Sequence, residues 1–429
     1  MGVVPSMTGN MNRKSISSKE LESLVGLALN EAKTLGADQA EASASQDTGL
    51  SVTARLGDVE NLEYTNDRCI GITVYKDNCK GSASTSDITP TAIREAVTKA
   101  YSFAKYTAED LNSGLADAEL MATKILDLDL EHHWDIDAEQ AIALAIKCEN
   151  AAMAHDKRIC NSEGATVNTN RGIRAYGNSH GFFGSAPKTS HGISCVVLAE
   201  QDGAKQRDYH YTSSRVPSDL EEVESVGIEA GRKTIARLGA RKIKTTAAPV
   251  LYVPSLARGF IGHAMSAISG NAQYRRSSFL LDAIGKKIFS DFVQVQERPH
   301  IPQGILSCAY DGEGVATYDR DIIIDGCLDG YILDSYSARR LGLKTTANSG
   351  GVQNLLIPGS DTNKSKLIKE MGSGLVIEEL IGQGVNGVTG DYSRGAAGHW
   401  VENGEIQFPV HEVTIAGNLL DLYQRIIAI

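Results

Sequence analysis

Three features that would assign a protein to a common class are missing from this sequence. No run of apolar residues is long enough to span a bilayer, and residues 1–18 hold no apolar segment of the kind found in secretory signals. The seven cysteines include no CxxC pair, which favours reduced thiols over a disulfide framework. We therefore expect a cytoplasmic protein with no membrane partner.

An excess of positive charge is also missing. The chain has 42 Lys and Arg against 53 Asp and Glu, for a net charge of −11. Non-specific DNA binding depends on neutralising phosphates with basic side chains, so no direct nucleic-acid partner is expected. The apolar content of 42% and charged content of 22% are ordinary for a globular protein, and 429 residues suggest two or three domains.

Residues 17–240 indicate an α+β domain in which the order helix, several strands, helix occurs twice. The two halves cover about 17–106 and 135–240, and residues 1–16 are predicted to be a disordered tail. Capping boxes at Ser17–Glu20 and Ser218–Glu221 predict helix starts, as does Asp137. The acidic segment Thr107–Trp134 is expected to join the halves as a loop along a surface. In the first half we predict strands around Ala40–Ser45, Leu50–Leu56, Glu60–Tyr64, Cys69–Lys76 and Gly81–Ser84.

Residues 247–429 change in character to short strands and glycines. Asp325-Gly326 and Asn403-Gly404 each separate two strand-like runs, and such dipeptides suit hairpin turns that need positive φ. The pattern predicts a β-rich, mostly antiparallel C-terminal domain with a barrel-like or strongly curved sheet. The fold class is thus α+β.

One stretch at the start of this domain bears on chemistry. An apolar strand-like run, Pro249–Pro254, is followed by a helix of small residues with a single histidine, His263. Metal-assisted peptide hydrolysis needs about three protein ligands, an open position for water and a carboxylate that takes the proton from that water. A lone imidazole cannot supply these. His263 is most simply a packed, hydrogen-bonded histidine, and a ligand shared at a subunit boundary is the alternative.

This stretch and several other runs resemble the TldD/PmbA family of peptide-processing proteins, most closely its PmbA (TldE) branch. The runs extend over most of the chain: Gly71–Tyr75, Lys80–Ser84, Gly177–Gly181, Tyr336–Leu343, Thr389–Gly398 and Trp400–Ile406. The resemblance implies an α/β N-terminal part and a β-rich C-terminal domain, paired as dimers around an enclosed chamber. Family members commonly run past the position of Ile429 into a further segment.

The same resemblance implies what this chain lacks. The sister branch, TldD, carries His-Glu-x-x-x-His and binds a metal; here His263, Ala264 and Ile268 occupy those three motif positions. The family's third ligand is a cysteine near the C-terminus, and this sequence has none after Cys327. We therefore expect no catalytic residue, metal or cofactor in this chain, and zinc in a TldD-type partner.

The expected function is that of a non-catalytic, regulatory or structural subunit, inactive alone. It would pair with a TldD-type metalloprotease in peptide maturation and in the degradation of small or unfolded peptides, and a homodimer is also compatible. Two alternatives stay open: an autonomous metallopeptidase with unorthodox ligands, and a binding protein that modulates DNA gyrase through protein contacts.

Two pairs of cations beside aromatic residues are candidates for peptide binding or for a subunit interface. They are Tyr274-Arg275-Arg276 and Arg339-Arg340 in the C-terminal domain. Arginine forks match a peptide's carboxylate. Arginine and tyrosine are also common at interfaces, so the sequence leaves both roles open.

Overall fold

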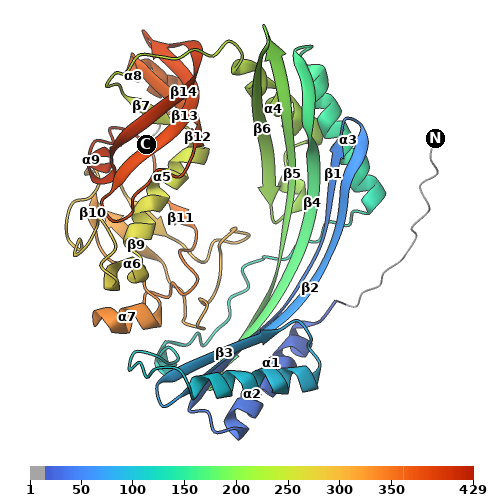
Figure 1. The fold of residues 1–429 in the computed structure, drawn as a ribbon, viewed down its shortest axis with the longest axis vertical. Coiled ribbons are helices and arrows are strands. Elements are labelled where there is room, and N and C mark those ends of the chain that lie inside the picture. The colour runs from blue at the N-terminus through green and yellow to red at the C-terminus, as the bar shows by residue number, and fades with distance from the viewer. Residues whose placement is uncertain (1–14, 361) are drawn as a thin grey trace. The chain divides into compact units, whose positions relative to one another are not determined.

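The computed structural model describes residues 15–360 and 362–429, and it confirms a mixed α+β fold (Figure 1). The long strands of the N-terminal half form one six-stranded sheet in the order β3-β2-β1-β4-β5-β6. Their bounds are β1 Gln39–Arg55, β2 Asp58–Lys76, β3 Cys79–Thr85, β4 Ile159–Asn178, β5 Phe183–Gln201 and β6 Ala204–Ser214. The predicted disordered tail lies outside the described residues, apart from its last two positions. Of these, Ile16 is buried and donates its N–H to Gln46 Oε1.

The chain divides into two compact units, of which the first comprises residues up to 48, 66–109 and 172–187. Two helices cover its part of the sheet: α1 (Ser18–Thr34) and α2 (Pro90–Ala104). The predicted capping box is confirmed, since Ser17 Oγ accepts from the Glu20 N–H while the Glu20 carboxylate accepts from the Ser17 N–H. Leu21, Val25, Ile72 and Val97 are fully or almost fully buried in the core of this unit.

The second unit comprises residues 49–65, 110–171 and 188–429. Its part of the six-stranded sheet is covered by α3 (Ala138–His155) and α4 (Val223–Ala236). These helices pack closely because Gly227 has no side chain: a Cβ there would lie 2.1 Å from the carbonyl oxygen of Cys148. The cap at Asp137 is confirmed as a full capping box with Gln140.

The capping box predicted at Ser218–Glu221 is wrong. Residues Pro217–Asp219 form a 3-10 turn (η2), and α4 begins only at Val223, after Glu222. Glu221, the last residue of the expected capping box, makes tertiary contacts instead. The Glu221 N–H donates to Thr212 Oγ1, and its carboxylate lies 3.0 Å from His210 Nε2.

The C-terminal part contains two four-stranded sheets, β10-β9-β8-β11 and β14-β13-β12-β7. All their pairings are antiparallel except that of β7 with β12. The strand bounds are β7 Val250–Tyr252, β8 Val295–Glu297, β9 Arg320–Ile324, β10 Cys327–Leu328, β11 Leu355–Leu356, β12 Gly374–Ile381, β13 Asp391–Glu402 and β14 Glu405–Asn418. Both predicted hairpin turns are present, and all four residues have positive φ. The angles are 49° at Asp325 and 73° at Gly326, and 54° at Asn403 and 76° at Gly404.

Five helices accompany these sheets: α5 Pro254–Ala267, α6 Gly270–Tyr274, α7 Ser335–Leu341, α8 Lys364–Met371 and α9 Leu419–Gln424. Helix α5 contributes to a core that also contains residues of both sheets, such as Val295, Ile322 and Tyr392 (Figure 1). The segment from residue 110 to 134 has one 3-10 turn, η1 (Ala118–Leu120), and pairs with this domain through the bridge between Met121 and Val315.

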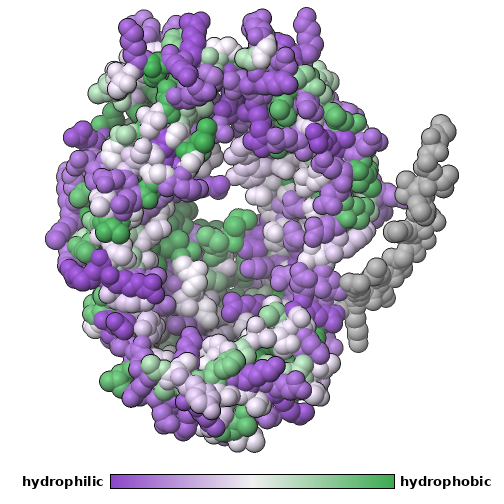
Figure 2. Space-filling view, viewed as in Figure 1, coloured by the Kyte–Doolittle hydropathy of each residue, from purple (hydrophilic) through white to green (hydrophobic). Residues whose placement is uncertain are grey.

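Hydrophilic residues predominate on the surface visible in Figure 2, with apolar residues in small patches between them. Within residues 15–360 and 362–429, no helix has both the length and the apolar character needed to cross a membrane. All seven cysteines lie among these residues, and all seven are free thiols.

Candidate functional site

Helix α5 carries His263 and Ala264 and ends directly before Ile268, and aromatic residues hold it in place. Pro254 occupies the first turn, where its missing N–H leaves no hydrogen bond unmade. The Phe260 ring stacks on Tyr252 at 4.9 Å and meets Tyr423 edge-on at 4.9 Å. The Tyr423 hydroxyl also donates to the Phe260 carbonyl oxygen at 2.8 Å. The position of His263, one turn later, is therefore tied to the core.

His263 is half-buried on this helix. Its ring packs edge-on against Tyr392, with 6.0 Å between the ring centroids. Burial, together with the positive charge of Arg394, lowers the pKa of His263 below its ordinary value, so the imidazole is neutral at neutral pH. The predicted packing is present, but none of the described residues forms a hydrogen bond with His263.

The residues at the three expected motif positions do not fit a zinc site. Ala264 and Ile268 are both 0% exposed and belong to the hydrophobic core. No three His, Cys, Asp or Glu side chains in the described part of the chain are grouped so that they could hold a metal ion. The guanidinium of Arg394 contributes to the lowered pKa of His263, and its positive charge would repel a metal cation.

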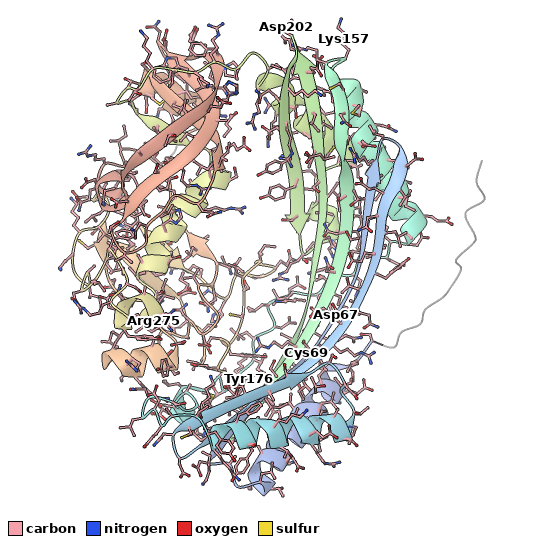
Figure 3. All side chains as sticks on the ribbon, viewed as in Figure 1. Asp67, Cys69, Lys157, Tyr176, Asp202 and Arg275 are labelled. Atoms are coloured by element: carbon pink, nitrogen blue, oxygen red, sulfur yellow. The ribbon has the colours of Figure 1, made fainter. Side chains whose placement is uncertain are left out.

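The Tyr274-Arg275-Arg276 candidates lie at the end of α6. Arg275 follows the helix and stacks its guanidinium over the Tyr274 ring, 5.8 Å from the centroid. Figure 3 shows Arg275 between α6 and α7. Arg276 has a positive φ of 54° and lies 3.6 Å from the Asp282 carboxylate. Both arginines are exposed.

The Arg339-Arg340 candidates lie on α7, which Asp334 caps. Arg339 donates to the carbonyl oxygens of Asn112, Gly114 and Leu115, and to the Asp117 carboxylate at 3.0 Å. Acceptors of the same chain thus satisfy the hydrogen-bond donors of Arg339.

Its neighbour Arg340 lies over the Tyr274 ring, 5.2 Å from the centroid. It also lies 4.0 Å from the carboxylate of Asp110, which accepts a hydrogen bond from the Tyr336 hydroxyl. The structure therefore brings Arg275 and Arg340 together at Tyr274.

The sequence analysis missed Arg394 on β13. Its Nε is buried without a hydrogen-bond partner, and no carboxylate of the described residues pairs with it. Tyr392 and Arg394 are two positions apart on one strand, so their side chains share a face. The spacing of Tyr392 and Arg394 in the sequence could have indicated that they share a face of one strand. The sequence analysis used the run Thr389–Gly398 only for the family resemblance.

Sequence profiles of the PmbA/TldA metallopeptidase family match three segments of the chain. Domain 1 matches residues 40–104, the central domain 131–238 and the C-terminal domain 245–429. The chain is also 48% identical to Metalloprotease PmbA of Escherichia coli O157:H7 over 411 residues, which covers 96% of this chain and 91% of that protein.

Two solved structures have the same fold. A protein of Bacteroides thetaiotaomicron described as a proposed modulator of DNA gyrase superposes with a TM-score of 0.91 at 26% identity, covering 96% of this chain and 94% of that one. TldE of Thermococcus kodakarensis superposes with a TM-score of 0.81 at 20% identity, covering 95% and 93%. The profile matches and the 48% identical PmbA relative show that the chain belongs to the PmbA/TldA metallopeptidase family, on its PmbA branch.

Proposed function

We propose that this chain is a non-catalytic subunit of a TldD/TldE-type metalloprotease complex that processes or degrades small or unfolded peptides. The observation that carries this proposal is the burial of Ala264 and Ile268 in the core beside a lone histidine. The likeness to proteins named PmbA and TldE is consistent with it. The free thiols fit a reducing compartment such as the cytoplasm.

The chemistry supports a division of labour between two subunits. Peptide hydrolysis at zinc needs three ligands and a base near the metal-bound water. At this position the chain offers one imidazole, an alanine with no proton acceptor and an isoleucine in the core. A TldD-type partner would supply the zinc and the base, while this chain would supply binding surface and shape.

The test is reconstitution with a TldD-type metalloprotease of the same cell. We expect the two purified chains to form a stable heteromer that cleaves an unfolded model peptide, whereas this chain alone is inactive and binds less than about a tenth of an equivalent of zinc. The matched control is a heteromer in which the partner's motif glutamate is changed to glutamine, which should assemble and remain inactive. Peptidase activity of this chain alone, in proportion to bound zinc, would establish the autonomous metallopeptidase instead.

A second candidate is a modulator of DNA gyrase, because the Bacteroides protein of the same fold carries that description. The net charge of −11 argues that such an effect would act through protein contacts and not through DNA. Affinity purification of the tagged chain separates the two: recovery of gyrase subunits without a TldD-type chain favours modulation, and recovery of a TldD-type chain favours the complex.

A further inference from the structure

Arg394 is a partly buried cation without an anion. In the described part of the chain its Nε has no hydrogen-bond partner, and no Asp or Glu lies within ion-pair distance. Removing a guanidinium from water without pairing it is unfavourable, and buried arginines are therefore normally paired. A partner from outside the chain would remove this cost.

A second polar group at the same place has an unused donor. The Tyr392 side chain is 1% exposed, and the Tyr252 hydroxyl donates toward its oxygen, but the Tyr392 O–H itself donates to none of the described residues. Buried hydroxyls whose O–H finds no acceptor are uncommon. Two adjacent groups on one face of β13 thus both have donors available for an acceptor.

The neighbouring face of α5 leaves room for a ligand. Gly259, Gly262, His263 and Ser266 are spaced so that they share one face of the helix. A Cβ at Gly259 or Gly262 would meet no atom within 4 Å beyond the helix's own backbone. The neutral His263 imidazole, which none of the described residues engages in a hydrogen bond, borders this open face.

We propose that Arg394, with His263 and the Tyr392 hydroxyl, binds a carboxylate of a peptide. A single guanidinium beside a neutral imidazole matches one negative charge, and its planar fork matches the two oxygens of a carboxylate. The open glycine face gives the rest of the peptide a path along α5.

The identification of the ligand as a peptide rests on the proposed function, whereas the carboxylate chemistry rests on Arg394. The carboxylate could be the C-terminus of a peptide or an Asp or Glu side chain. Three otherwise identical peptides distinguish these sources: one with a free C-terminus and no acidic residue, one amidated with a single Glu, and one amidated and neutral. Their binding to the full chain is measured by calorimetry.

We expect the neutral amidated peptide to bind at least about tenfold more weakly than one of the two carboxylate peptides, the difference expected for a charge-assisted hydrogen-bonded pair. The peptide that binds identifies the source. Arg394→Gln should abolish this preference, while Arg94→Gln, a change of an exposed arginine on α2, should keep it. Equal binding of all three peptides, or an unchanged preference in Arg394→Gln, would overturn the proposal.

A second measurement does not depend on a variant that folds. A carboxylate beside His263 offsets the charge of Arg394, so saturating N-acetylalanine should raise the pKa of His263 in a histidine NMR titration. The NMR signals of His155 on α3 are the control and should not change when N-acetylalanine is added. An unmoved His263 would contradict the site. The outcomes also separate the two proposals: an active heteromer without the carboxylate preference rejects only the site, and the preference without an active heteromer rejects only the complex.

Discussion

Arg339 on α7 and Arg394 on β13 are both partly buried in the C-terminal half, but they differ in their hydrogen-bond and ion-pair partners. Arg339 donates to three carbonyl oxygens and one carboxylate of the chain's own residues 112–117. Arg394 has neither a carboxylate nor a partner for its buried Nε in the described part of the chain. The hydrogen bonds of Arg339 stabilise the fold, whereas the unpartnered Nε of Arg394 lowers its stability.

The buried ion pair between Arg320 and Glu297 sets the upper limit of this comparison. Glu297 is 1% exposed, accepts from Arg320 Nε at 2.7 Å and also accepts from Asn348 Nδ2 and the Gln353 N–H. Glu297→Ala should lower the free energy of unfolding by about 3–5 kcal/mol, because it leaves a buried charge unpaired. Urea denaturation measures the loss. The double variant with Arg320→Met should recover part of it, and no recovery would mean that the charge is not the cause.

Arg339→Gln should have the next largest effect. It leaves the carbonyl oxygens of Asn112, Gly114 and Leu115 with fewer donors and the Asp117 carboxylate without its cation. We expect a loss of about 2–4 kcal/mol in the free energy of unfolding. The adjacent Arg340, which is exposed, is the control: Arg340→Gln should cost less than about 1 kcal/mol. If both variants lost the same unfolding free energy, the hydrogen bonds of Arg339 would not explain its contribution to stability.

Glu313 is the acidic counterpart of Arg394. No cation of the described residues pairs with it, and burial, with the nearby Asp311 and Asp334 carboxylates, raises its pKa to about 7 from the ordinary value of 4.5. Between these two values the folded state binds more protons than the unfolded state, so the unfolding free energy falls as the pH rises. The contribution is complete below about pH 4.5 and lost as the pH passes 7.

Glu313→Gln should therefore match the unchanged protein near pH 4.5 and exceed it in stability at pH 8, by the order of 2–3 kcal/mol. Gln keeps an acceptor for the Ser335 N–H, which lies 3.0 Å from the Glu313 carboxylate. Urea unfolding at the two pH values measures the difference. A difference that does not vary with pH would assign the effect to packing instead of ionisation.

Arg394→Met should have the smallest effect on the free protein. The methionine keeps much of the side-chain volume and removes an unpaired charge, so we expect stability to be unchanged or raised by up to about 1 kcal/mol. Thermal unfolding without ligand measures this. A loss greater than about 1 kcal/mol would show that Arg394 already has a structural partner, and the contrast with Arg339 would fail.

Local signals in the sequence predicted local structure well. Ser17 and Asp137 cap helices as expected, because a cap needs only a side-chain oxygen and the next few N–H groups. The turns at Asp325-Gly326 and Asn403-Gly404 formed because their backbone angles suit few other residues. At Ser218–Glu221, Thr212 and His210 of β6 contact Glu221 instead of a box forming. Predictions from local sequence were thus reliable where no residue from another element competed for the local partners.

The sequence alone determined the α+β class, the hairpin turns and the family resemblance. Only the tertiary structure decided that the chain's own carbonyl oxygens accept hydrogen bonds from Arg339, while Arg394 has no carboxylate partner among the described residues. The reason is physical: an arginine's role depends on which acceptors come within about 3 Å of its donors, and those acceptors are separated from Arg339 by more than 200 residues of chain.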